Sequence, residues 1–77
     1  MPIYYALETY DGYRLKTILL EKGLTPADLA KRTREEVSMS TIKNMIHQRR
    51  PTVREGTVHA LARALYVDEE ILRGEEE

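Results

Sequence analysis

GLTPADLAKRTREEVSMSTIKNMIHQRRP, residues 23–51, is the stretch of sequence that decides the fold of this chain. Within it, Thr25 stands directly before Pro26, and Asp28 follows two residues later. Threonine is a favoured N-cap, proline is favoured at the first helical position, and an acidic residue at the third position can reach back to the cap as in a capping box. The pattern predicts a helix over about 26–33.

A second short helix follows, with a start signal of the same kind. Ser38 can cap it, and Val37 before the cap would pack onto Ile42 as a hydrophobic staple. The apolar spacing predicts a helix over about 39–48, and Pro51 requires the chain to leave it, since the residue before proline is disfavoured in helices. Its buried stripe would consist of Ile42, Met45 and Ile46. Two short capped helices with arginines gathered after the second are typical of a DNA-binding helix-turn-helix.

Composition limits the classes of protein to which the chain can belong. Its 77 residues suffice for one small domain. It contains no cysteine, which excludes disulfides and thiolate metal sites and leads us to expect a cytoplasmic protein. No apolar run approaches the roughly 18 residues that a membrane span requires, and no signal-peptide pattern precedes the first charged residues.

The net charge of −1 conceals an uneven distribution along the chain. Residues 31–54 carry seven basic and two acidic side chains, a net charge of +5, whereas residues 55–77 carry two basic and seven acidic ones, a net charge of −5. Phosphate groups respond to the local field, because salt screens surface charges beyond about 8 Å. The basic block coincides with the second helix of the pair and the residues after it, which favours a nucleic acid over a merely solvated charged face.

The residues before this stretch also read as a helix. Asp11 is its expected cap, and Gly23 stands where a left-handed residue commonly ends a helix. Leu24 after the glycine would contact the last buried turn, as in a Schellman motif. The apolar positions repeat with a helical period and consist of Leu15, Ile18, Leu19 and Leu20.

Two further helices are predicted after the basic block. Thr52 and Glu55 form another capping-box pattern, which predicts a fourth helix to about residue 66, with Thr57 as a competing start. Asp68 is the expected cap of a short fifth helix that Gly74 would end. The predicted fold class is therefore all-α, a compact bundle of about five short helices.

The N-terminal segment differs from the rest of the chain. Residues 3–10, IYYALETY, are rich in tyrosine, lack a helix cap and alternate as in a short β-strand. A lone strand cannot satisfy its backbone groups, so it would pair most simply with the same segment of a second chain; otherwise it extends the first helix. We therefore predict a strand-like segment over 1–10 that can contact a second copy, a helix-turn-helix domain over 11–74 and an acidic tail over 75–77.

Five pieces of the chain, taken in order, resemble the lambda-repressor-like, Cro/Xre-type helix-turn-helix family. They are RLKTILLEKGLT, DLAKRT, VSMSTIKNMI, RRP and TVHALARALYV. The resemblance extends over roughly residues 13–72, and the order of the pieces is more specific than any one of them. It implies a repressor-like transcriptional regulator that binds duplex DNA sequence-specifically, usually as a homodimer on a palindromic operator, in bacteria or their phages.

The chain departs from the family pattern at three places. The family usually has a three-residue turn closed by glycine before the second helix of the pair. Here Arg34, Glu35 and Glu36 stand between Thr33 and Val37, which amounts to two extra residues without the glycine. Either the first helix of the pair runs half a turn longer or the turn is wider. Leu19 and Ile46 stand where the family commonly pairs an arginine with a glutamate, which indicates an apolar contact in place of an ion pair. Pro26 stands where the family often has a glutamine that touches phosphate, and proline cannot make that contact.

The exposed face of the helix over about 39–48 is the expected site of contact with base edges in the major groove. Asn44 can pair with adenine, Lys43 can donate to guanine, Met39 can contact a thymine methyl group, and Ser40 can bond to donors or acceptors. Structural explanations also fit Met39 as a packing residue, Ser40 as a helix-start hydroxyl and Lys43 as a solvated or phosphate-bound lysine. Asn44 is the favoured base-reading residue, because asparagine has poor helix propensity and little structural reason to lie in the middle of a helix.

Phosphate contacts are expected around both ends of this helix. Arg49 and Arg50 follow it directly, and although a helix C-terminus favours positive charge, that explains one arginine better than two. The predicted phosphate-contacting residues are Thr25, Ser38, His47, Arg49, Arg50 and Arg54.

Other classes of function find less support. There is no cysteine nucleophile and no glycine-rich phosphate loop, and His47 and His59 fall on different predicted helices, so we expect no catalysis, no cofactor and no metal site. The rival interpretation is a protein-interaction module, such as an antitoxin or adaptor, whose DNA binding is weak or lost. A homodimer would use either the N-terminal strand, with Tyr4 and Tyr5, or the C-terminal helices, with Val67, Ile71 and Leu72.

Overall fold

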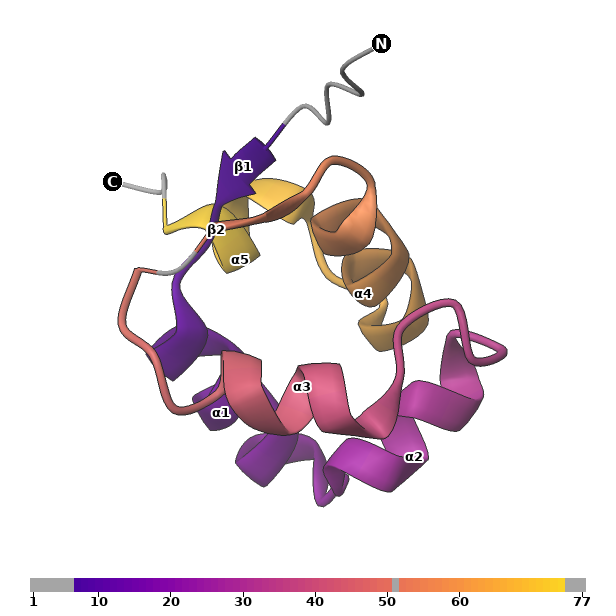
Figure 1. Cartoon of the computed structure of the whole chain (residues 1–77). Helices are drawn as coiled ribbons and strands as arrows, with labels where there is room; N and C mark the ends of the chain where they lie inside the picture. Colours follow the sequence, from indigo (N-terminus) through magenta and orange to yellow (C-terminus); the bar gives the residue numbers. More distant parts are fainter. Residues whose placement is uncertain (1–6, 51, 75–77) are drawn as a thin grey trace, which may run out of the picture.

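The computed structural model describes residues 7–50 and 52–74. Along the chain it has β1 (Leu7–Thr9), α1 (Gly12–Lys22), α2 (Pro26–Arg32), α3 (Met39–Met45), β2 (Thr52–Arg54), α4 (Thr57–Leu65) and α5 (Glu69–Arg73). Figure 1 shows the helices arranged around a common centre, with the two short strands beside α5. The predicted bundle of five short helices is confirmed. The predictions for Tyr4, Tyr5, Pro51 and the acidic tail lie outside the described residues.

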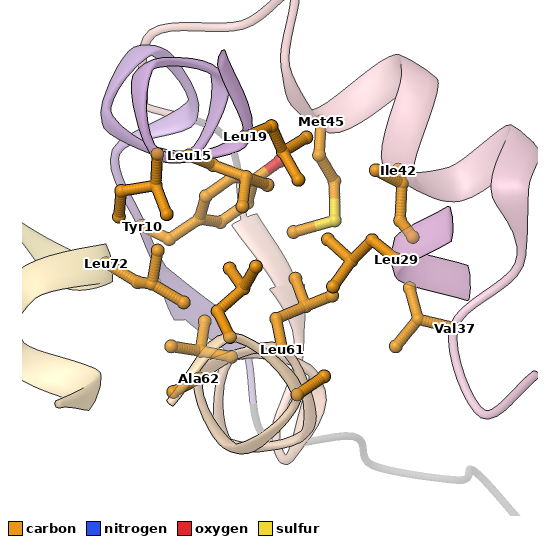
Figure 2. Close-up of a cluster of buried hydrophobic side chains, with 14 of the residues drawn as sticks. Tyr10, Leu15, Leu19, Leu29, Val37, Ile42, Met45, Leu61, Ala62 and Leu72 are labelled. Atoms are coloured by element: carbon orange, nitrogen blue, oxygen red, sulfur yellow. The ribbon is translucent and has the colours of Figure 1, made fainter. Parts of the chain in front are cut away.

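One apolar cluster, to which every helix contributes, forms the core. Leu15, Leu29, Ile42, Leu61 and Leu72 come from α1 to α5 in that order, and none is more than 1 % exposed. Figure 2 shows side chains of α3 and α4 reaching into this cluster from opposite sides. Each such buried side chain contributes about 1.5–3 kcal/mol, and this burial stabilises helices that are too short to form alone.

The limits of α1 agree with the sequence analysis. The Asp11 side chain accepts a hydrogen bond from the backbone N–H of Arg14 at 3.0 Å, and Gly23 ends the helix in the left-handed region with φ of 67°. One of its predicted apolar positions is wrong, because Leu20 is 71 % exposed. Leu20 lies about 100° further round the helix than Leu19, which is buried, and so turns out of the core.

The N-terminal strand finds its partner within the same chain. β1 pairs antiparallel with β2, with Leu7 opposite Arg54 and Thr9 opposite Thr52. The prediction that this segment needs a second chain as its partner, and the alternative that it extends the first helix, are both wrong for residues 7–9. Tyr10, which follows, is 1 % exposed and belongs to the core.

The start of the fourth helix is also corrected. Thr52–Arg54 is a strand, so the capping box predicted from Thr52 and Glu55 does not open a helix. α4 begins only at Thr57, after Gly56, which adopts φ of 96°. The β-branched side chains of Thr52 and Val53 suit a strand, and Gly56 supplies a backbone conformation that other residues adopt at a cost.

A network of charged side chains links β1 to α4 and α5. Glu8 accepts hydrogen bonds from the Arg73 guanidinium at 2.7 Å and from the backbone N–H of Gly56 at 2.9 Å. Arg73 also donates to Glu69 at 2.9 Å, and the second carboxylate oxygen of Glu69 bonds to Nδ1 of His59 at 2.8 Å. The acidic C-terminal region therefore provides partners for basic groups inside the domain.

Of the two alternatives for the connection from α2 to α3, a longer helix or a wider turn, the structure has the wider turn, since α2 ends at Arg32. Arg34 and Glu35 both have positive φ, 57° and 66°, in the left-handed region. The Glu35 N–H donates to the Ala30 carbonyl at 2.9 Å. The buried Thr33 hydroxyl donates to the same carbonyl at 2.8 Å and accepts from the Val37 N–H at 3.3 Å. A threonine side chain thus closes this turn without the glycine that the family pattern has.

Candidate nucleic-acid interface

The first helix of the pair, α2, begins as its sequence predicts. The Thr25 hydroxyl accepts a hydrogen bond from the Asp28 N–H at 3.1 Å, and the Asp28 carboxylate accepts one from the Thr25 N–H at 3.0 Å. These bonds form the predicted capping box, and the bond from the Thr25 backbone lowers the pKa of Asp28. Thr25 is exposed, so its hydroxyl, which can still donate its proton, lies at the surface at the start of the helix pair.

The second helix of the pair, α3, is capped as predicted and packs on α2. The Ser38 hydroxyl accepts from the Thr41 N–H at 3.2 Å and bonds to the Thr41 hydroxyl at 2.9 Å. Val37, which precedes the cap, is 5 % exposed and lies in the same core cluster as Ile42. The start of α3 is therefore fixed both by hydrogen bonds and by apolar packing.

The two faces of α3 differ as the sequence predicts. Ile42 and Met45 are 0 % and 2 % exposed, and Ile46 after them is half-buried. The four predicted base-contacting residues are all exposed and consist of Met39, Ser40, Lys43 and Asn44. Their polar side-chain groups form no hydrogen bond to another described residue, so they are available to an external partner.

α3 ends three residues earlier than predicted, at Met45. After it, the His47 N–H donates to the Asn44 carbonyl at 3.3 Å, and the Gln48 side chain donates to the same oxygen at 3.3 Å. A backbone bond to the residue three positions back, such as that of His47, tightens the last turn of a helix. His47, which was expected within the helix, is exposed and lies in this turn.

The end of α3 lies against the start of α1. The backbone N–H of Gly12 donates to the Arg49 carbonyl at 3.1 Å. A side chain at Gly12 would overlap the carbonyl oxygens of Met45 and Gln48. Gly12 therefore allows α1 to pack closely against the segment that leaves α3, a role that the sequence analysis missed. The available signal was a glycine at the first position of a helix, where its low propensity suggests a packing reason.

The arginines of the basic block lie before and after α3, and Lys43 lies on it. Arg49 and Arg50 are exposed and follow α3, and the exposed Arg54 ends β2. Arg32 and Arg34 lie before α3, at the end of α2 and in its exit turn. The seven residues of α3, about 10 Å along the helix, separate the two groups. Of the predicted phosphate-contacting residues, Thr25 and Ser38 begin α2 and α3, and His47, Arg49 and Arg50 follow α3.

Leu19 and Ile46 stand where the family pattern has an ion pair, and both lie in apolar surroundings. Leu19 is 3 % exposed within the core cluster, and Ile46 packs against that cluster. No charge has to be desolvated there, which removes a cost that buried ion pairs carry. A direct contact between these two side chains stays a prediction.

Of the three C-terminal residues predicted as a dimer surface, two remain available in the structure. Leu72 is 1 % exposed, so it serves the core and cannot meet a second copy. Val67 and Ile71 are half-buried and line a hollow beside α1 with Ile18.

In the described part of the chain, no three His, Asp or Glu side chains gather as a metal site would require, and none of the helices there has the length and apolar character needed to cross a bilayer.

Comparison with known proteins gives a match that extends over most of the chain. A family model described as a Cro/C1-type HTH DNA-binding domain matches residues 14–72. This range contains α3, the residues that follow it and nearly all of α1. Neither the curated proteins nor the solved structures give a match to the chain.

Proposed function

Since the chain belongs to the Cro/C1-type HTH DNA-binding domain family, we propose that it is a sequence-specific, repressor-like regulator of transcription that places α3 in the major groove of duplex DNA. We further propose that it acts as a homodimer on a palindromic operator, in the cytoplasm of a bacterium or a phage-infected cell. The proposal assigns it no catalytic step, cofactor or metal.

One observation supports this function above the others. The outer face of α3 carries exposed polar side chains that no described residue engages, and two exposed arginines follow directly where α3 ends. A helix that served packing alone would not need this combination. Base edges require donors and acceptors that are free to pair, and the phosphate backbone requires positive charge beside them.

Each exposed side chain of α3 has a proposed role at the base edges. Asn44 donates to adenine N7 and accepts from adenine N6, and Lys43 donates to guanine O6 or N7. Met39, 40 % exposed near the start of α3, contacts a thymine methyl group, and Ser40 bonds to a neighbouring base. Good bidentate pairs discriminate between bases by about 1–3 kcal/mol each.

The residues at both ends of the helix pair are proposed to hold the DNA backbone. Arg49 and Arg50 neutralise phosphates beside the end of α3, with His47 and Arg54 as further contacts. The hydroxyl groups of Thr25 and Ser38 donate to phosphates at the starts of α2 and α3. These contacts would fix the orientation of α3 on the duplex without reading the sequence.

Dimerisation is proposed because one short helix reads too few base pairs to define an operator alone. Two-fold symmetric proteins of this kind present their reading helices about 34 Å apart, one turn of DNA. β1 offers a surface for the second copy, since Leu7 is 65 % exposed and β1 pairs, within the described residues, only with β2. Sedimentation of the full chain and of its Leu7→Glu variant would show whether this surface joins two copies.

Binding to duplex DNA of random sequence tests the function against its rival. Fluorescence anisotropy at low salt should show binding that weakens steeply as salt rises, because bound phosphates release counterions. Selection from a random duplex pool should then yield a palindromic motif. An antitoxin or adaptor that has lost DNA binding would give no salt-sensitive binding to any duplex.

A further inference from the structure

A second basic surface lies away from the outer face of α3. A hollow of about 1020 Å³ is open to solvent between the exit turn of α2 and α4. Figure 1 shows α3 and α4 on different sides of the domain, and Figure 2 shows their apolar side chains meeting in the core between them. The outer face of α3 therefore lies on the other side of the core from α4, which lines this hollow. The residues that define its chemistry are Arg32, Arg34, Glu36, His59, Arg63 and Tyr66.

Positive charge dominates the lining of the hollow. Three guanidinium groups, those of Arg32, Arg34 and Arg63, face a single carboxylate, that of Glu36. All three arginines are exposed, so their charged groups lie at the surface and not in the core. Guanidinium groups bind phosphate oxygens with paired, charge-assisted hydrogen bonds. The hollow therefore suits a ligand that carries phosphate groups.

Two of the lining side chains are held in place by the fold. One guanidinium nitrogen of Arg32 donates to the Ala64 carbonyl at 3.3 Å, which ties α2 to α4 and leaves the remaining N–H groups of Arg32 for a ligand. The Nδ1 atom of His59 bonds to Glu69 at 2.8 Å, which leaves Nε2 for a ligand. A hollow whose polar groups are already positioned binds at a lower entropic cost.

An aromatic ring also lines the hollow. Tyr66 is 87 % exposed and adopts φ of 59°, although glycine or asparagine is favoured in this conformation. Neither backbone preference nor core packing accounts for a tyrosine at this position. An exposed ring beside guanidinium groups can stack on a planar ring of a ligand.

The hollow depends on a feature particular to this chain. Arg34 and Glu36 belong to the long connection between α2 and α3, where the sequence departs from the pattern of the family that it resembles. Two of the residues that line the hollow therefore lie where the family pattern gives no expectation.

We propose that this hollow binds a free nucleoside diphosphate. The guanidinium groups of Arg32, Arg34 and Arg63 hold the two phosphates, and the ring of Tyr66 stacks on the base. The volume of the hollow, about 1020 Å³, slightly exceeds the range of small-molecule sites, about 300–1,000 Å³, and leaves room for both parts of the ligand.

Calorimetric titration of the full chain with ADP and with inorganic pyrophosphate, in the absence of DNA, tests the proposal. Both probes should bind at one saturable site. Arg63→Gln should weaken both by about tenfold, the loss expected when one charge-assisted contact is removed. Tyr66→Asn, which keeps a residue that tolerates this φ, should weaken ADP while leaving pyrophosphate within about twofold. Lys16→Gln on α1 removes one exposed charge outside the hollow and should change neither by more than about twofold.

A DNA backbone offers the same phosphate chemistry, and duplex binding distinguishes the two sources. If the ligand is free, Arg63→Gln leaves the affinity for random duplex within about twofold. A loss of duplex affinity as large as that caused by Arg49→Ala would assign the hollow to DNA and overturn the proposal. The absence of saturable ADP binding, or equal losses from Arg63→Gln and Lys16→Gln, would overturn it as well. Because the titrations contain no DNA, they can fail while the proposed function holds, and the reverse is also true.

Discussion

The backbone N–H of Gly12 donates a hydrogen bond to the carbonyl oxygen of Arg49 at 3.1 Å, joining the first turn of α1 to the segment that leaves α3. The contact is possible because Gly12 has no side chain to meet the carbonyl oxygens of Met45 and Gln48. It couples the fold to the proposed function, since Arg49 and Arg50 are positioned by the same segment.

Gly12→Ala should destabilise the protein and displace the residues after α3. The added methyl group overlaps backbone atoms that cannot rotate away, and overpacking of this kind costs about 1–3 kcal/mol or more. Urea denaturation followed by circular dichroism measures the loss. Gly23→Ala is the matched control, because its new methyl group meets nothing and only its φ of 67° is unfavourable, at about 1 kcal/mol. Equal losses from the two substitutions would mean that the contact with α3 is unimportant.

Tyr10→Phe should leave the protein as stable as before or stabilise it by about 1 kcal/mol. The Tyr10 hydroxyl is buried and has no hydrogen-bond partner among the described residues, and burial raises the pKa of the phenol. Removing it takes away a desolvated polar group while keeping the ring in the core. Thermal denaturation measures the change, with Tyr13→Phe, on a 54 % exposed ring, as the control expected to be neutral. A clear loss of stability from Tyr10→Phe alone would show that the hydroxyl has a partner.

Glu69→Gln should remove part of the acid sensitivity of the fold. The hydrogen bond from His59, and then that from Arg73, lowers the pKa of Glu69 below its ordinary value of 4.5. A carboxyl group whose pKa is lowered by folding stabilises the native state above its unfolded pKa, and this contribution is lost as the pH falls through the folded pKa. The variant should therefore be less stable than the natural chain near pH 7, and the difference should narrow below about pH 4.5. Urea midpoints between pH 3 and 7 measure it; a constant difference across that range would contradict the assignment.

Arg49→Ala and Arg50→Ala should weaken binding to specific and random duplexes alike. Each removes a proposed phosphate contact, so the slope of log affinity against log salt should fall by about one per substitution. Anisotropy titrations at several salt concentrations measure both effects. Lys16→Ala on α1, to which no DNA contact is assigned, is the control and should leave the slope unchanged. A loss confined to one duplex sequence would show that the arginine reads a base.

The parts of the fold that the sequence predicts correctly are those that neighbouring residues determine. Asp11, Thr25 and Ser38 each cap a helix through an N–H group three positions ahead, so the pattern is visible in the sequence itself. The exposed face of α3 follows in the same way from the period of Ile42 and Met45. The surface position of the candidate base-contacting residues could therefore be predicted from their spacing alone.

The parts that were wrong depend on residues far apart in the sequence. Thr52–Arg54 has side chains compatible with a helix start, and it becomes a strand because β1 lies opposite it. The early end of α3 coincides with the packing of Gly12, more than 30 positions earlier in the chain, against its last carbonyls. No local pattern contains these contacts. The same limitation concealed the grouping of Arg63 from α4 with Arg32 and Arg34 around one hollow.

The central claim is that the outer face of α3 reads base edges. The base preference of the Asn44→Ala variant tests this claim more directly than any other measurement. Duplexes selected from a random pool by the natural chain and by Asn44→Ala should differ at one base pair in each half-site. The A·T pair preferred by the natural chain should become degenerate there, at a cost in discrimination of about 1–3 kcal/mol. An identical selected motif, or a uniform loss of affinity for every duplex, would contradict the account.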